Sequence, residues 1–213
     1  MGRRWGYPLE RELRAAGQLI AGVDEVGRGP LAGPVVACAV IMPPEARPIR
    51  GVSDSKELTI RERERLDVQI RAQALTWALG AASVREVEER NILQATVRAM
   101  HRALKRLSVR PSTVLIDGRP LASLTWTHHA VVDGDRRCYC IAAASIIAKV
   151  ARDRLMRSLS SRYPGYGWDH NCGYGTAEHK AAIGSLGITP HHRQSFLTTV
   201  LPDPQGSLLA AMG

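Results

Sequence analysis

The alternation of short apolar segments with longer amphipathic ones constrains the fold of this chain more than any other feature of its sequence. Five segments are rich in β-branched or other apolar residues and are short enough to be buried strands. They cover residues 19–24, 34–42, 75–82, 113–116 and 125–132. Because helical patterns fall between the third and fourth segments and after the fifth, the sequence predicts an α/β layer with a mixed sheet.

Two helices carry explicit signals at their ends. Residues 9–16 follow Pro8 and precede Gly17, which is the favoured arrangement of these two residue types around a helix. Thr59 and Glu62 have the spacing of a capping box. The sequence therefore predicts a short first helix and a charged second helix that continues to about residue 73.

Apolar periodicity and turn residues indicate three further helices. One is marked by an apolar stripe at intervals of four, three, four and three residues and ends before Pro111. The stripe consists of Leu93, Val97, Met100, Leu104 and Leu107. A long helix is expected over residues 141–162 and a final one over 176–186.

The charge of the chain suggests a polyanionic partner. Lys and Arg total 29 against 20 Asp and Glu, which gives a net charge of +9. A nucleic acid would be attracted to such a protein, although a basic face that only meets solvent accounts for the charge equally well. The cysteines include no CxxC pair, so reduced structural thiols are expected. They are Cys38, Cys138, Cys140 and Cys172.

The length of 213 residues suits one domain, here residues 1–213, with a helical C-terminal part over about 163–200 and a disordered tail over 202–213. Apolar runs stay well below the roughly 20 residues needed to cross a bilayer, so no membrane association is expected. Residues 7–14 are charged where a secretion signal needs an apolar core. We therefore expect a cytoplasmic protein.

Acidic residues follow the apolar strands closely. Asp24 and Glu25 close the first strand, Asp117 ends the fourth, and Asp135 follows the fifth. Carboxylates that converge at one end of a sheet repel one another unless a divalent cation neutralises them. Ligands that are all oxygen favour Mg²⁺ or Mn²⁺. Two such ions about 4 Å apart can hydrolyse a phosphodiester, one by activating water and the other by stabilising the leaving oxygen.

Each acid also has a structural explanation. An Asp next to Gly is ordinarily a turn former, and Asp133 and Asp135 fit that role. Neighbouring residues of a strand point to opposite faces, so Asp24 and Glu25 share a site only if the strand ends or twists there. The glycine at position 27 makes such a turn plausible.

An ordered set of motifs resembles those of the ribonuclease HII family of bacterial type. Residues 24–35, DEVGRGPLAGPV, resemble the opening motif of that family, and the match extends from about residue 19 to 196. The further motifs, in family order, are SDSK at 53–56, IDG at 116–118, GD at 134–135, IAAASIIAKV at 141–150, RD at 152–153, YPGY at 163–166, GYGT at 173–176 and HRQSF at 192–196.

This resemblance implies a ribonuclease H-like fold, with a five-stranded mixed sheet flanked by helices and a helical C-terminal part. It also implies that Asp24, Glu25, Asp117 and Asp135 are the catalytic carboxylates and bind Mg²⁺ or Mn²⁺. Asp153 competes with Asp135 for the fourth place. We favour Asp135, because Asp153 has Lys149 and Arg157 four residues away on either side, as in an ordinary helical ion pair.

The resemblance further implies a substrate-binding set. The backbone of Gly27, Arg28 and Gly29 is expected to contact the ribose 2′-hydroxyl and a phosphate, because a glycine lets the main chain approach a sugar. Tyr174 is expected to pack on the neighbouring sugar, and Lys56 to lie near the substrate phosphate. The structural alternatives are a simple turn for the glycines and a solvated lysine.

One departure from the family pattern concerns the residues before the GYGT motif. Relatives commonly have a lysine there, whereas this chain has Asn171 and Cys172. A phosphate contact is then lost or is supplied elsewhere. The paired histidines at 128–129 and 191–192 have no place in a site built from oxygen ligands, so we assign them structural or surface roles.

The expected function is that of a monomeric endonuclease. It would cut the phosphodiester 5′ of a ribonucleotide in RNA–DNA hybrids or duplex DNA, leaving 3′-hydroxyl and 5′-phosphate ends, during removal of such ribonucleotides. A ribonuclease HIII-like enzyme is one alternative, although that family carries a sizeable N-terminal domain and fewer than two dozen residues precede Asp24 here. A non-catalytic nucleic-acid-binding module is the other, and the presence of all four acids argues against it.

Overall fold

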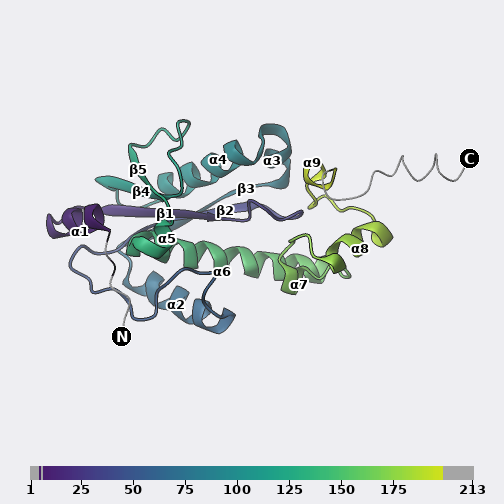
Figure 1. Ribbon diagram of the computed structural model, residues 1–213, viewed down its shortest axis with the longest axis horizontal. Coiled ribbons are helices and arrows are strands. Elements are labelled where there is room, and N and C mark those ends of the chain that lie inside the picture. Colours follow the sequence, from purple (N-terminus) through teal and green to yellow (C-terminus); the bar gives the residue numbers. More distant parts are fainter. Residues whose placement is uncertain (1–4, 6, 199–213) are drawn as a thin grey trace, which may run out of the picture.

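A mixed five-stranded sheet forms the centre of the molecule in the computed structural model, which describes residues 5 and 7–198 (Figure 1). The strand order is β3-β2-β1-β4-β5. The strands are β1 Ile20–Val26, β2 Val35–Ile41, β3 Thr76–Ala82, β4 Thr113–Asp117 and β5 His128–Val131. β1, β2 and β3 pair antiparallel, whereas β4 pairs parallel with both β1 and β5. The predicted α/β fold with a mixed sheet is confirmed.

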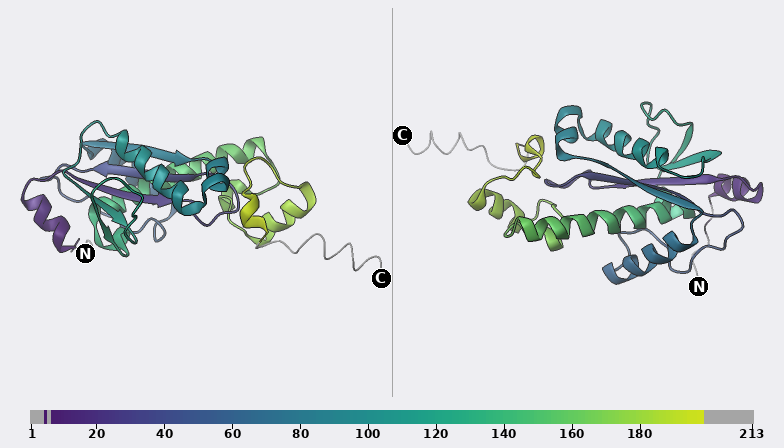
Figure 2. Two further views of the ribbon diagram at one scale, coloured as in Figure 1. Left: turned by 90° about the horizontal axis from the view of Figure 1, so that it is seen from above. Right: turned by 180° about the vertical axis from the view of Figure 1, so that it is seen from behind.

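Helices cover both faces of this sheet. α3 Val84–Arg90 and α4 Ile92–Lys105 lie on one side, and α2 Ile60–Gln73 and α6 Tyr139–Arg162 lie on the other (Figures 1 and 2). The strands are apolar on both sides because each face meets a helix layer. In β1, for example, Val23 packs in the core under α4. Two opposing layers therefore enclose the sheet, and polar groups are tolerated only near its ends.

Local signals explain where the well-predicted helices begin. Thr59 caps α2 in a complete capping box with Glu62. α1 Pro8–Ala15 starts with its proline, and α8 Ala177–Leu186 is capped by the Thr176 side chain. These helices were predicted to within one or two residues, because their boundaries depend on neighbouring residues only.

The structure corrects parts of the sequence prediction. β5 begins at His128, three residues later than predicted. The apolar stripe predicted for α4 is buried only in its middle. Leu93 is 44% exposed in the first helical turn, and Leu107 lies beyond the helix. Four helices were not predicted, and all are short: α3, α5 Gly134–Arg137, α7 Trp168–Asn171 and α9 Gln194–Leu197.

The C-terminal helices pack beside one end of the sheet (Figure 1). Trp168, Tyr166 and Ile183 are buried there against Leu31 and Met156, the latter from α6. This confirms the helical C-terminal part. The tail predicted over 202–213 lies outside the described residues, and the single-domain assignment stays a prediction.

Glu10 ties the first helix to the start of α6. Its carboxylate is buried and accepts hydrogen bonds from the backbone N–H groups of Tyr139 (2.8 Å) and Cys140 (2.9 Å). These are the first two residues of α6, and Cys138 at the cap position supplies no side-chain bond. Glu10 therefore replaces the missing local cap of the longest helix.

No helix in the described part of the chain is long and apolar enough to span a bilayer. The four cysteines are free, and three of them are buried, as expected of structural thiols. The fourth, Cys172, is only partly buried.

Candidate active site

The parallel pairing of β1 and β4 brings the first acids together. Val23 pairs with Ile116, and the ladder between these strands stops there. Asp24 and Asp117 are the next residue on each strand, so they lie side by side where the two strands separate. β1 continues to Val26 in its ladder with β2, which corrects the expectation that Asp24 and Glu25 close the strand.

Asp24 and Glu25 point to opposite faces of the sheet, as their positions within a continuing strand require. Asp24 is 6% exposed on the α6 side, where the Ser145 side chain lowers its pKa against the larger effect of burial. Glu25 instead lines a groove with residues of α4. The Glu25 N–H donates to Asp24 Oδ1 at 2.7 Å. The site therefore extends around the point where β1 and β4 separate, with one acid on each face.

Asp117 links this pair to the fourth acid. Its Oδ1 accepts a hydrogen bond from the Gly134 N–H at 2.7 Å, which holds α5 against the end of β4. A Cβ at Gly134 would lie 2.7 Å from Ile141 Cδ1 and 3.1 Å from Asp117 Oδ1, so this approach requires glycine. Asp135 follows at once and is buried, whereas Asp133 is exposed with a left-handed φ of 54°. Of these two acids, the turn former is Asp133.

Burial and mutual repulsion raise the pKa values of three of these acids. For Asp24 burial is the largest cause, followed by the charges of Glu25 and Asp117. Burial also raises the pKa of Glu25, and Arg28 at 3.1 Å opposes the shift. Burial and the charge of Asp117 raise the pKa of Asp135, against the effect of Lys56. The Asp117 charge thus reaches all three acids, so the cluster gains from any added positive charge.

The donor set suits a hard divalent cation. All four side chains offer carboxylate oxygens, and Glu25 Oε2 is buried without a hydrogen-bond partner. Within the described residues, no three Asp, Glu, His or Cys side chains converge tightly enough to hold one ion. Two of the carboxylates instead engage protein cations, with Glu25 on Arg28 and Asp135 on Lys56 at 3.3 Å. Metal binding here requires these side chains to exchange those partners for the ion.

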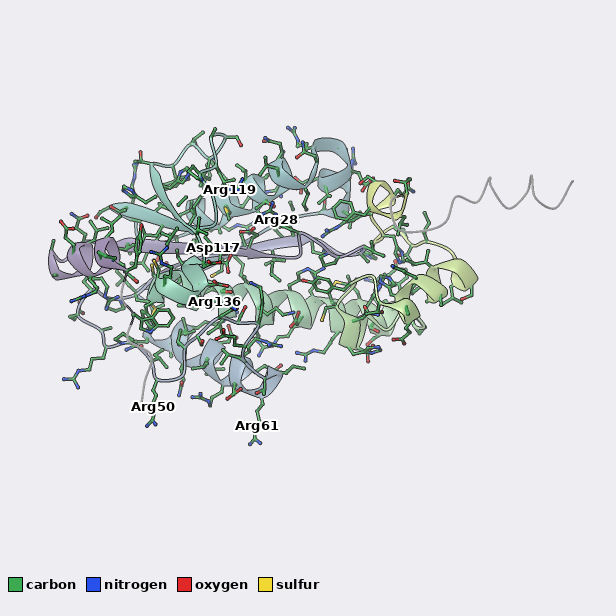
Figure 3. The ribbon with its side chains drawn as sticks, viewed as in Figure 1. Arg28, Arg50, Arg61, Asp117, Arg119 and Arg136 are labelled. Atoms are coloured by element: carbon green, nitrogen blue, oxygen red, sulfur yellow. The ribbon has the colours of Figure 1, made fainter. Side chains whose placement is uncertain are left out.

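An open groove of about 700 Å³ runs along the Glu25 side of the cluster. Arg28, Asp117 and Arg119 line it together with residues of α4. In the view of Figure 3, Arg28 and Arg119 lie above Asp117 and Arg136 lies below it, whereas Arg50 and Arg61 project away from it. A larger depression of about 800 Å³ lies against α2, but it has no acidic lining residue. The acid-lined groove with its arginine rim is therefore the candidate site for a phosphodiester.

The glycines at positions 27 and 29, in the loop after β1, have different roles. Gly27 has φ +93°, and a Cβ there would collide with the Arg152 side chain and lie 2.7 Å from the carbonyl oxygen of Pro34. Gly29 is different, because a Cβ there would meet only Tyr174 Cε1, at 3.9 Å. Packing explains why position 27 is a glycine. At position 29 packing gives no such reason, and a glycine there leaves the backbone open to a ligand. Tyr174 is 43% exposed and lies next to Gly29.

The comparison with known families decides which family the chain belongs to. The family model described as Ribonuclease HII matches residues 21–199. The chain belongs to the ribonuclease HII family. This confirms the resemblance drawn from the motifs and makes the chain a ribonuclease H, a hydrolase that acts on RNA–DNA hybrids. It also decides against the ribonuclease HIII alternative and the non-catalytic module.

Relatives and solved structures agree with this membership of the ribonuclease HII family. A ribonuclease HII of Thermosynechococcus vestitus is 54% identical over 188 residues, covering 86% of each chain. The crystal structure of ribonuclease H2 from Pyrococcus horikoshii is 30% identical with a TM-score of 0.72, covering 83% of this chain and 92% of that one. The structure of Bst ribonuclease HIII in complex with Mn²⁺ is 18% identical with a TM-score of 0.61, covering 93% and 73%, and supports the fold alone.

Asp153 forms one of the two ion pairs expected along its helix, with Lys149, whereas Arg157 pairs with Glu64 instead. The Asp153 carboxylate contacts Lys149 at 2.8 Å and Arg63 at 3.9 Å. Asp135 is buried and directly follows Gly134, whose N–H donates to Asp117 Oδ1. The geometry therefore favours Asp135 over Asp153.

Asn171 has a structural role in this chain. It is buried, its Nδ2 donates to the Tyr166 carbonyl at 2.7 Å, and its Oδ1 accepts from the Gly173 N–H at 2.8 Å. These bonds shape the loop that carries Tyr174. Among the histidines, His192 is buried and hydrogen-bonded to His179 at 3.1 Å, in keeping with a structural role.

Several residues that shape the site were not predicted. The Ser145 hydroxyl is hydrogen-bonded to Ser55 at 2.9 Å, and Asp54 is buried and accepts from Arg136 at 3.1 Å. Arg152 and Arg193 are fully buried under the loop of residues 27–34. All of these except Arg136 lie within the motifs quoted above, but a motif alone does not indicate that an arginine is buried.

Proposed function

We propose that this enzyme hydrolyses the phosphodiester on the 5′ side of ribonucleotides, both in RNA–DNA hybrids and at single ribonucleotides in duplex DNA. Its products carry 3′-hydroxyl and 5′-phosphate ends. The observation that carries the proposal is the cluster of four carboxylates, joined electrostatically through Asp117, next to an exposed loop at Arg28 and Gly29. Such a cluster suits metal-assisted phosphodiester cleavage, and such a loop suits the recognition of a sugar.

Asp24, Glu25, Asp117 and Asp135 are the proposed ligands of Mg²⁺ or Mn²⁺. Bound divalent ions would supply the Lewis acidity that activates water and stabilises the leaving oxygen. The protein contributes their placement. The Gly134 N–H orients Asp117, and the Glu25 N–H donates to Asp24 Oδ1. The Mn²⁺ held by Bst ribonuclease HIII, a protein of the same fold, supports a divalent ion.

Gly27, Arg28, Gly29, Lys56 and Tyr174 are the proposed substrate-binding residues. The loop offers backbone groups close to the acids, and the exposed Tyr174 ring offers a face on which a sugar can pack. Lys56 is 78% exposed at its side chain and lies 3.3 Å from Asp135, at the rim of the cluster. A phosphate that arrives there would meet a positive charge beside the acids. The net charge of +9 supports a nucleic-acid partner at longer range.

Cleavage of three duplexes tests the proposal. One duplex holds a single ribonucleotide, one a run of ribonucleotides, and one none. We expect Mg²⁺- or Mn²⁺-dependent cutting of the first two, 5′ to a ribonucleotide, and no cutting of the third. Asp117→Asn should lower turnover at least about 10³-fold while duplex binding persists. Turnover of Asp117→Asn close to that of the wild-type enzyme would refute the carboxylate assignment.

A further inference from the structure

Two arginines are buried beneath the loop of residues 27–34 without an acidic partner. Arg152 and Arg193 are both 0% exposed, and among the described residues neither guanidinium forms an ion pair with a carboxylate. Burial lowers the pKa of Arg193, and the charge of Arg152 lowers it further. Removing such a cation from water costs free energy, and apolar residues of similar volume in its place often make a protein equally stable. Stability alone therefore gives a poor account of these two residues.

Both guanidinium groups donate their hydrogen bonds to backbone carbonyl oxygens. Arg193 donates to the carbonyl oxygens of Gly27 (2.6 Å), Arg28 (3.0 Å) and Gly33 (2.6 Å from Nη2 and 3.0 Å from Nε). Arg152 donates to three other carbonyls, and none of them belongs to residues 27–29. Those three are Ala32 at 2.9 Å, Pro34 at 3.0 Å and Cys172 at 2.9 Å. Arg193 therefore binds the part of the loop proposed to recognise the ribose, and Arg152 binds the parts around it.

The bonds of Arg193 decide which way two peptide groups face. In a trans peptide the C=O of one residue and the N–H of the next point in opposite directions, and the described chain has no cis peptide. Because the carbonyls of Gly27 and Arg28 point inward to Arg193, the N–H groups of Arg28 and Gly29 point outward. Within the described residues neither N–H has a hydrogen-bond acceptor. Two successive free N–H groups on an exposed loop form a concave site for an oxygen acceptor.

Three backbone hydrogen bonds hold the loop around these groups. Arg193 N–H donates to the Leu31 carbonyl at 2.8 Å, and Gly33 N–H donates to the His191 carbonyl at 2.9 Å. Leu31 N–H donates to the Gly173 carbonyl at 2.8 Å. The N–H pair is therefore preorganised and does not have to be ordered when a ligand binds.

We propose that Arg193 is a positioning residue for ribose recognition: by binding the carbonyls of Gly27 and Arg28 it aims the N–H groups of Arg28 and Gly29 at the 2′-oxygen of the ribonucleotide. This inference rests on the proposed function. The planar guanidinium is needed because its fork reaches three carbonyls at once, whereas a lysine ammonium at the same place is a single point. The buried charge also adds a positive potential behind the N–H pair.

The test compares Arg193→Lys with the matched variant Arg152→Lys, both in the Asp117→Asn background so that binding is measured without cleavage. The readout is the ratio of affinities for a duplex with one ribonucleotide and the same duplex in DNA only. We expect Arg193→Lys to lower this ratio about tenfold, since an aligned hydrogen bond is lost. Arg152→Lys should keep it within about twofold. Melting temperatures and the affinity for the DNA duplex establish that each variant is folded.

The outcomes separate this inference from the proposed function. If the Asp117→Asn protein with both arginines intact does not distinguish the two duplexes, ribose recognition by this enzyme is wrong. If it does distinguish them and folded Arg193→Lys keeps the same ratio, the role of Arg193 is wrong. Should Arg193→Lys not fold, amide NMR of the Asp117→Asn protein decides: the Arg28 and Gly29 amide signals must differ between the ribonucleotide and DNA complexes. Identical signals in both complexes would overturn the inference.

Discussion

Asp24, Glu25 and Asp135 show how single residues couple the stability of this enzyme to pH. Each has a pKa raised by burial and by neighbouring negative charge. A carboxyl whose pKa is higher in the folded state than in the unfolded state binds its proton more tightly when folded. Its contribution to stability is therefore greatest below the unfolded pKa and is lost as the pH rises through the folded pKa.

We accordingly expect these three carboxyls to lower the stability of the metal-free enzyme as the pH rises above about 4, through the range of their raised pKa values. Asp24→Asn should flatten this decline, because the group that repels Glu25 and Asp117 loses its charge. Melting temperatures in EDTA across the pH range measure the effect. Mg²⁺ should raise the melting temperature most at neutral pH, where the carboxylates are ionised. An equally steep decline in Asp24→Asn would contradict the assigned repulsion.

The glycines of the loop give a second test at the scale of one residue. Gly27→Ala forces a side chain against Arg152 at a positive φ, so we expect a loss of stability of about 1–3 kcal/mol. Gly29→Ala has room for its methyl group and should leave the melting temperature unchanged while it weakens binding of the ribonucleotide duplex. Denaturant unfolding and duplex binding of both variants provide the measurement. Wild-type binding by Gly29→Ala would leave the glycine at 29 without a functional explanation.

Helix α6 illustrates what holds an element in place when its own sequence lacks a cap. Its N-terminal N–H groups are satisfied by Glu10, which is more than 120 residues away in sequence. α6 packs against the sheet, and its first turn is held in place by a residue of another helix.

We expect Glu10→Ala to cost about 1–3 kcal/mol in the free energy of unfolding, because it leaves buried N–H groups without an acceptor. Glu12→Ala is the matched control: Glu12 lies on the same helix, is exposed and should change stability by less than about 0.5 kcal/mol. Urea unfolding at pH 7 measures both variants. Equal effects of the two substitutions would show that Glu10 does not cap α6.

Over the whole molecule, the net charge of +9 makes duplex binding dependent on salt. Each phosphate contact adds about 0.9 to the slope of log affinity against log salt concentration. We expect Lys56→Ala to lower this slope by about one contact, because Lys56 is exposed beside the acid cluster. Lys105→Ala is the control, since Lys105 is an exposed lysine that lines a separate depression near β4. The same slope in Lys56→Ala and the wild-type enzyme would remove Lys56 from the binding surface.

The sequence by itself determined the elements whose signals are local. The capping box at Thr59, the helix that starts at Pro8 and the apolar strands depend on neighbours in the chain, and the structure agrees with each. The ordered motifs also determined the family, because their residue types and their order can be recognised without knowing which residues are in contact in the fold.

Tertiary structure alone decided how these parts meet. It extended β1 past Glu25 and so placed Asp24 and Glu25 on opposite faces, formed the short helix α5 that brings Asp135 to Asp117, and buried Arg193 beneath the loop. Each of these depends on contacts between residues far apart in sequence. Periodicity and turn signals carry no information about such contacts, because the energy that favours them arises only when the packed partners are present.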